Sequence, residues 1–169
     1  MSLFESVGGF ISNLGKPSSF RKGDSFEKYV EDYHFPKHLY DIVHKTHNYT
    51  QNKDRYVESS LQPDFRFRDK LTGREFYLEC KYRGGFNGGS LDWCNDEQLI
   101  RYKKYDKECP VFLIIGLGGV ADVCDHVLFF KLSHLPYKSI FQSVFSKYEV
   151  PVDSFIPSRL LWSDFNFKK

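Results

Sequence analysis

The chain reads PDFRFRDKLTGREFYLECK from Pro63 to Lys81, and this stretch decides the fold that we predict. Aromatic and charged residues alternate over 64–68, and apolar and polar residues alternate over 75–81. Alternation with a period of two is typical of half-buried β-strands. The segment 69–74 between them contains Asp, Thr and Gly, which favour a turn. The sequence therefore predicts a β-hairpin with Pro63 at a strand start, where a missing backbone N–H matters least.

The predicted hairpin brings three charged side chains together. Alternation places Glu79 and Lys81 on one face of the second strand and turns the Cys80 side chain toward the core. Asp64 belongs to the charged face of the first strand, so strand pairing brings it near Glu79. Two carboxylates and one ammonium can hold a divalent metal against a phosphodiester, which predicts a site that cuts nucleic acid. The alternative for the same pattern is an amphipathic hairpin with a solvated charged face.

These residues resemble the motif of the PD-(D/E)XK nuclease superfamily, here as Pro63-Asp64 and Glu79-Cys80-Lys81. The resemblance implies that Asp64 and Glu79 bind Mg²⁺ or Mn²⁺ and that the backbone carbonyl of Cys80 adds a ligand. It also implies that Lys81 assists the attacking water or offsets charge on the phosphate. Because a lysine between two carboxylates should stay protonated, we favour the electrostatic role of Lys81 over that of a general base.

A helix is predicted upstream of the hairpin. Apolar residues at 26, 29, 30 and 33 form a helical stripe over residues 23–33, which ends before Pro36. Glu27 on this helix matches the first-helix acid of the superfamily, which implies a catalytic role and metal binding through a water. The alternative is structural, because with Asp24 as N-cap Glu27 would complete a capping box.

A second helix is predicted after the hairpin, over residues 95–107, with Asn95 as its N-cap. Gln98 and Tyr102 are four residues apart and therefore share a face of this helix. Their Gln-x-x-x-Tyr spacing resembles the motif of the exonuclease-like branch of the superfamily. The resemblance implies that both side chains reach substrate or active-site groups and that Gln98 is catalytic. The alternative is a capping Gln and a packed Tyr.

Length and charge limit how the chain can bind nucleic acid. With 169 residues and 41% hydrophobic content, we expect one domain over 21–169, preceded by an amphipathic arm at 1–20. The net charge is only +2, so binding needs local positive charge. The expected partner is DNA, and RNA is not excluded. The residues that we predict to bind it, for which ordinary solvated faces are the alternative, are Arg66, Arg83, Arg101, Tyr102, Lys103 and Lys104.

The remaining strands complete an α/β fold. Strands are predicted over 39–46, 110–117 and 125–132, and the continuous apolar run in 110–117 is typical of a strand buried on both faces. The helix over 95–107 precedes that strand, which favours a parallel crossover. The order is then helix, three strands, helix, two strands. The resemblance implies a restriction-endonuclease-like core with a central mixed sheet of four to five strands flanked by helices.

Other features set the environment of the protein and leave alternatives open. No segment is long and apolar enough to span a membrane, and four cysteines without a Cys-x-x-Cys pair or an export signal predict a cytoplasmic protein. The glycine-rich loop 84–89 is a connector or a close approach to a sugar-phosphate. Residues 133–169 cover a sheet edge, form a homodimer contact or clamp substrate.

Three functions are consistent with these observations. The first is a metal-dependent DNA nuclease. The second is a catalytically inactive nuclease-fold module that binds nucleic acid or a partner, although all three motif positions are filled. The third is an unrelated α/β protein whose hairpin matches the motif by chance.

Overall fold

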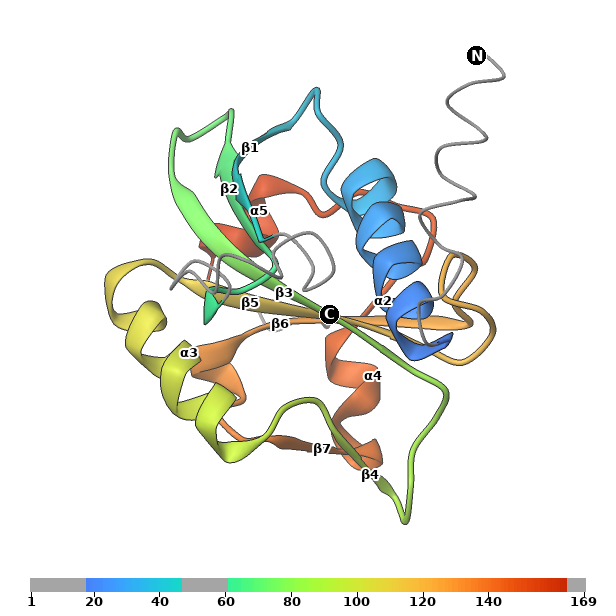
Figure 1. Cartoon of the computed structure of the whole chain (residues 1–169). Helices are drawn as coiled ribbons and strands as arrows, with labels where there is room; N and C mark the ends of the chain where they lie inside the picture. The colour runs from blue at the N-terminus through green and yellow to red at the C-terminus, as the bar shows by residue number, and fades with distance from the viewer. Residues whose placement is uncertain (1–17, 47–60, 164–169) are drawn as a thin grey trace, which may run out of the picture.

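Six strands form one mixed sheet in the computed structural model, which describes residues 18–46 and 61–163 (Figure 1). The elements of the first half are α2 (Ser18–Tyr29), the π-helical turn η1 (Val30–His34), β1 (Tyr40–Lys45), β2 (Phe65–Asp69), β3 (Glu75–Arg83) and β4 (Ser90–Asp92). The second half contains α3 (Asp96–Glu108), β5 (Val111–Leu117), β6 (His126–Lys131), η4 (Leu132–His134), β7 (Ser139–Phe141), η5 (Gln142–Val144), α4 (Phe145–Tyr148), β8 (Glu149–Val150) and α5 (Ser158–Trp162).

The large sheet has the strand order β1-β2-β3-β5-β6-β8. β1, β2 and β3 are antiparallel neighbours, and β5 runs parallel to β3 after the crossover through α3. β6 and β8 then add two antiparallel pairings. The predicted α/β class and the order of helices and strands are therefore confirmed. The sheet has six strands instead of the expected four or five, because the two-residue strand β8 pairs with the edge of β6.

The β2–β3 hairpin is confirmed with its predicted turn. Phe65 pairs with Leu78 and Phe67 with Phe76, so the aromatic face of β2 lies beside the apolar face of β3. Gly73 has a φ of 72°, a left-handed conformation that glycine adopts without steric cost. Its N–H donates to the carbonyl of Asp69 at 2.8 Å, which closes the turn.

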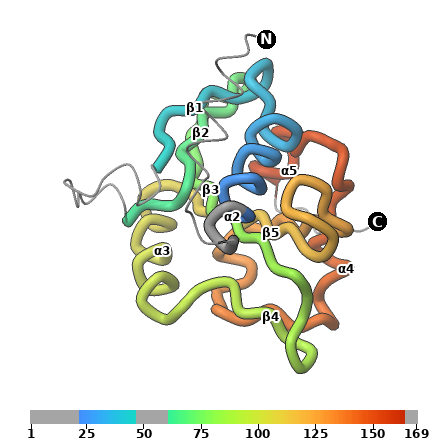
Figure 2. The backbone as a smooth tube through the Cα atoms, turned by 45° about the vertical axis from the view of Figure 1, so that its right-hand side comes forward, coloured from blue at the N-terminus to red at the C-terminus, as the bar shows by residue number. Residues whose placement is uncertain are grey.

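Each face of the large sheet carries its own hydrophobic core. One core includes Phe26 of α2 and Leu161 of α5, and the other includes Tyr102 of α3 with residues of the small β4–β7 sheet (Figures 1 and 2). The prediction that β3 is half-buried is wrong, because residues 76–80 are all buried. α3 and its neighbours cover the face that was expected to be solvated, so Glu79 lies inside the protein.

The first helix differs from its prediction at its start. α2 begins at Ser18, so Asp24 lies in the interior of the helix and cannot be the N-cap. The alternative role of Glu27 in a capping box is therefore wrong. The helix continues into η1 and ends before Pro36, as predicted. Phe35 leaves the helical conformation with φ −127° and ψ 60°, because the proline ring disfavours a helical residue before it.

The described part of the C-terminal region covers the sheet. Ile156 and Leu161 enter the first core, and β8 extends the sheet edge. The buried carboxylate of Asp69 accepts hydrogen bonds from Ser158 Oγ at 2.5 Å and Trp162 Nε1 at 2.6 Å. The described residues therefore cover the sheet and extend its edge, and the homodimer contact and the substrate clamp stay predictions.

Other expectations concern the ends of the chain and its environment. Most of the predicted N-terminal arm lies outside the described residues. Over residues 18–46 and 61–163, we find no helix with the length and hydrophobicity needed to cross a membrane. The four cysteines are free.

Candidate active site

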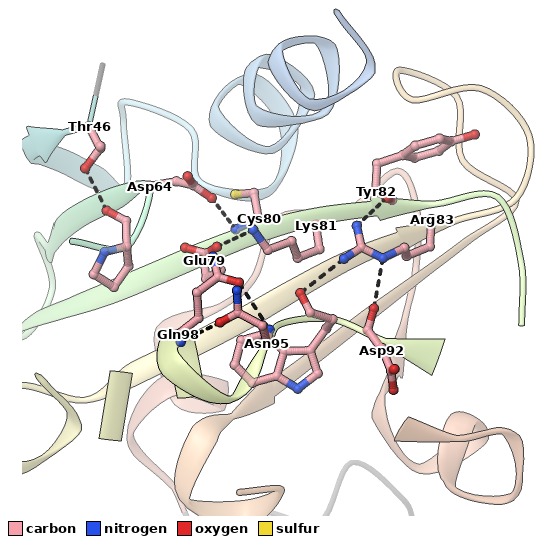
Figure 3. A network of polar contacts seen from close by, with 12 residues as sticks. Thr46, Asp64, Glu79, Cys80, Lys81, Tyr82, Arg83, Asp92, Asn95 and Gln98 are labelled. Atoms are coloured by element: carbon pink, nitrogen blue, oxygen red, sulfur yellow. Dashed lines mark hydrogen bonds and ion pairs between the residues drawn. The ribbon is translucent and has the colours of Figure 1, made fainter. Parts of the chain in front are cut away.

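Asp64 sits at the open end of the hairpin, just before β2 begins (Figure 3). Its Oδ2 accepts a hydrogen bond from the backbone N–H of Cys80 on β3 at 2.8 Å. Burial and the negative charge of Glu79 raise the pKa of Asp64 well above its ordinary value, although Lys81 and the Cys80 amide partly offset them. A cation near this carboxylate would favour its ionised form.

Glu79 and Lys81 form a buried ion pair on β3. Only 2% of the Glu79 side chain is exposed, and its Oε1 lies 2.5 Å from Nζ of Lys81. Burial alone would lower the pKa of Lys81, but the charges of Glu79 and Asp64 raise it above its ordinary value. Lys81 is therefore a stable ammonium. The second oxygen of Glu79, Oε2, is also buried, and no described residue donates a hydrogen bond to it.

Glu27 approaches the same place from α2. Burial raises its pKa to about 7, and the charges of Asp24 and Glu79 act in the same direction. Lys45, at the end of β1, is the strongest charge that lowers it again. Lys45 also forms an ion pair of 2.8 Å with Glu31. No sequence pattern marks Lys45 as a site residue, because the approach of β1 to α2 depends on tertiary structure.

A cleft of about 470 Å³ opens between α2 and β3. Asp64, Glu27 and Lys81 all line it, so the structure brings these three predicted residues to one solvent-accessible place. Glu79 does not line the cleft. It is buried next to the cleft and contacts Lys81, which does line it, through their ion pair. The other lining residues come from the middle of α2, from the C-terminal half of β3 and from the position after it, and they are Lys22, Gly23, Asp24, Cys80, Tyr82, Arg83 and Gly84.

Gln98 has a structural partner at the start of α3. Its backbone N–H donates to Asn95 Oδ1 at 2.8 Å, and its Oε1 accepts from the Asn95 N–H at 3.3 Å, which is a complete capping box. Asn95 was predicted as the N-cap, and the capping alternative for Gln98 is confirmed. Figure 3 shows the pair beside Glu79. A catalytic role for Gln98 would use the remaining amide group.

Tyr102 lies one turn further along α3 and is buried. Its ring stacks on Trp93 with centroids 6.1 Å apart. Burial raises the pKa of the hydroxyl far above its ordinary value, and the charges of Glu79 and Asp64 add to this effect. The ring is therefore packed in the core on the α3 side of the sheet, which confirms the alternative of a packed Tyr. The hydroxyl interacts electrostatically with the carboxylates of Glu79 and Asp64.

The predicted cationic residues differ in their exposure and in their partners. Lys103 and Lys104 are exposed on α3. The guanidinium groups of Arg66 and Arg83 already have partners inside the protein. Arg66 forms an ion pair of 2.7 Å with Glu75, and Arg83 donates to the carbonyls of Asp92 at 3.0 Å and Trp93 at 3.1 Å. Arg101 is half-buried, 5.6 Å from the ring centroid of Tyr102.

The donor set suits a hard cation, although it is not assembled for one. In the described parts of the chain, no three His, Cys, Asp or Glu residues are grouped closely enough to hold a metal ion. However, Oε2 of Glu79 is buried without a donor, and the pKa values of Asp64 and Glu27 are raised by burial and by neighbouring carboxylates, among them Glu79 in both cases. Carboxylate oxygens are preferred ligands of Mg²⁺ and Mn²⁺. A divalent ion would satisfy these groups, so the residues fit a metal chemically.

Comparison with known proteins gives limited information. No protein-family model and no curated protein sequence matches the chain. Among solved structures, a similarity is found to Hjc, a Holliday junction resolvase from Archaeoglobus fulgidus, with 14% identity and a TM-score of 0.38. The match covers 50% of this chain and 66% of the resolvase, slightly less than two thirds of that protein. A similarity of this size carries no conclusion about activity.

Proposed function

We propose that the protein is a divalent-metal-dependent nuclease that hydrolyses phosphodiester bonds in DNA. The observation that carries this proposal is the meeting of Asp64, Glu79 and Lys81 at the open end of the hairpin, beside a cleft that Glu27 also lines. The proposal agrees with the resemblance of these residues to the PD-(D/E)XK superfamily. Clustering of carboxylates with raised pKa values around a lysine is typical of a functional site.

The proposed chemistry gives each residue one task. Asp64 and Glu79 would hold Mg²⁺ or Mn²⁺, with the carbonyl of Cys80 as a further ligand and Glu27 contributing through a water. When bound, the ion would polarise the scissile phosphate and make water a better nucleophile. Lys81 would stabilise the negative charge that develops on the phosphate, because its raised pKa keeps it protonated.

DNA would reach this site along the cleft between α2 and β3. Lys22 and Lys81 line the cleft, and Lys103 and Lys104 add exposed positive charge on α3. Contacts of this kind neutralise phosphates without reading sequence. Arg83 lines the cleft too, but we assign it chiefly to holding the segment around Trp93.

Cleavage assays on site variants test the proposal. Linear, circular, single-stranded and junction DNA are incubated with Mg²⁺ or Mn²⁺ and with wild type, Asp64→Asn, Glu79→Gln or Lys81→Ala. We expect each substitution to lower the rate at least about 100-fold, the scale found when one transition-state contact is lost. Asp41→Asn is the matched control, because Asp41 is exposed at the far end of β1, 3.0 Å from Lys70.

Two outcomes would contradict the proposal. Cleavage by Glu79→Gln in the presence of a chelator would show that another activity or a contaminant cuts the DNA. DNA binding by wild type without metal-dependent cleavage would favour the inactive nucleic-acid-binding module instead. Circular dichroism of each variant checks that the fold is retained.

A further inference from the structure

The segment that carries Asp64 lies outside the regular strand ladder, yet it is held by hydrogen bonds on two sides. The β1–β2 ladder ends with the pair Lys45 and Phe65. Beyond it, the N–H of Thr46 donates to the carbonyl of Asp64 at 2.8 Å, and Thr46 Oγ1 donates to the carbonyl of Pro63 at 2.9 Å (Figure 3). The Asp64 carboxylate accepts from Cys80 on the opposite side.

Pro63 makes the side chain of Thr46 important. A proline has no N–H, so its carbonyl is the one hydrogen-bonding group of that residue. Pro63 is buried, and a buried carbonyl without a donor costs free energy. Among the described residues, the donor found for this carbonyl is the hydroxyl of Thr46. Without it, the peptide that leads into Asp64 would have to turn toward water.

Resting on the proposed function, we infer that Thr46 is a positioning residue for Asp64. It fixes the backbone of Asp64 from the β1 side, while the Cys80 amide fixes the carboxylate from the β3 side. The carboxylate is then held at the cleft before any cation binds. A positioned carboxylate loses less conformational freedom on binding an ion, which is why residues that hold ligands affect metal affinity.

Thr46 is a cleaner test than its neighbour Lys45. Removing the Lys45 ammonium would disturb the ion pair with Glu31, but it would also remove a positive charge close to Glu27. Loss of the positive charge near Glu27 would strengthen cation binding, whereas loss of the ion pair with Glu31 would loosen the site and weaken it. Replacing Thr46 by valine changes no charge and keeps the β-branched shape, so only the hydroxyl is lost.

The experiment measures Mn²⁺ affinity by isothermal titration calorimetry without DNA, so its readout does not depend on cleavage. We expect Thr46→Val to weaken binding about tenfold, the low end for residues that hold metal ligands. Thr46→Ser keeps the hydroxyl and should bind within about twofold of wild type. Thr72→Val is the matched control, because it removes a similar hydroxyl bond, 2.7 Å to Asp69 Oδ2, at the opposite end of the hairpin. Thr72→Val should leave Mn²⁺ affinity unchanged.

The outcomes separate this inference from the proposed function. If wild type binds Mn²⁺ and Asp64→Asn abolishes it, but Thr46→Val binds as wild type does, the positioning role is overturned and the metal site stands. Equal weakening by Thr46→Val and Thr46→Ser, or by the Thr72 control, would also overturn it. If Asp64→Asn binds Mn²⁺ as tightly as wild type does, or if wild type binds no Mn²⁺, the proposed metal site is overturned and the inference with it. In active protein, Thr46→Val should raise the Mn²⁺ concentration needed for half-maximal cleavage, and saturating Mn²⁺ should restore the rate.

Discussion

Replacing Lys81 by methionine separates the two roles that this residue can have. In the structure Lys81 is the charge partner of Glu79, and in the proposed mechanism it stabilises the phosphate. Methionine has a similar length and no charge, so Glu79 would remain inside the protein without its ion pair. We therefore predict that, without metal, Lys81→Met has a lower free energy of unfolding than wild type, and that Mg²⁺ restores part of this difference.

The size of the effect follows from burial. The side chain of Glu79 is 2% exposed and that of Lys81 is 21% exposed, so water screens this 2.5 Å pair only weakly. Removing one partner of a buried ion pair costs roughly 3–5 kcal/mol, and the partial exposure of Lys81 favours the lower end, about 3 kcal/mol. A bound divalent ion would replace the missing positive charge. If the variant binds Mg²⁺ about tenfold more tightly than wild type does, its extra stabilisation at saturating Mg²⁺ is about 1.4 kcal/mol.

Urea unfolding followed by circular dichroism, with chelator and then with Mg²⁺, measures both quantities. Lys138→Met is the control, because it removes an exposed ion pair of 2.9 Å with Asp96, which water screens, and should leave stability close to that of wild type. The reasoning is refuted if Lys81→Met in chelator lies within about 1 kcal/mol of wild type, since a buried unpaired Glu79 requires more. It is also refuted if Mg²⁺ stabilises the variant no more than it stabilises wild type.

Three further predictions concern stability and the helix cap. The pKa of Glu27 is raised to about 7, so its contribution to stability is complete below about pH 4.5 and is lost as the pH rises through 7. The pKa of the buried His34 is lowered to about 4, so its contribution is complete above about pH 6.5 and is lost as the pH falls through 4. Asp64, whose pKa is also raised, contributes to the slope of both proteins, so the prediction concerns their difference: between pH 4.5 and 6.5 the free energy of unfolding of Glu27→Gln should rise with pH relative to that of wild type, and equal slopes in both proteins would contradict this. Asp69→Ala removes a carboxylate that accepts hydrogen bonds from Trp162 and three other donors, and should lower the free energy of unfolding by about 3 kcal/mol. The C-terminal region should then become accessible to limited proteolysis, and an unchanged digestion pattern would argue against the role of Asp69 in holding this region. Gln98→Ala should lower stability by about 1 kcal/mol through the lost cap while leaving the cleavage rate within about twofold of wild type, and a 100-fold slower rate would instead support a catalytic role.

Local patterns in the sequence were enough to predict the elements that carry the main motif. The alternation of Phe65 and Phe67 with charged residues, and the glycine at 73, predict the hairpin, because strand periodicity and turn conformation depend on near neighbours. The capping alternative for Gln98 was also visible from its spacing to Asn95. The spacing of Glu79 and Lys81 on one strand fixes that they share a face.

The surroundings of these residues could be learned only from the folded chain. Whether Glu79 is solvated or buried depends on α3, which packs over β3 as part of the crossover between β3 and β5. The start of α2 was misplaced, because Asp24 is a good N-cap in sequence but lies inside a longer helix. Thr46 is far from Asp64 along the chain, and only the pairing of β1 with β2 brings them together. The sequence alone therefore determined, through local periodicity, that Glu79 and Lys81 share one face of a strand that pairs with the segment of Asp64, and tertiary packing decided the burial of these residues, the pKa values of Asp64 and Lys81 and what holds them in place.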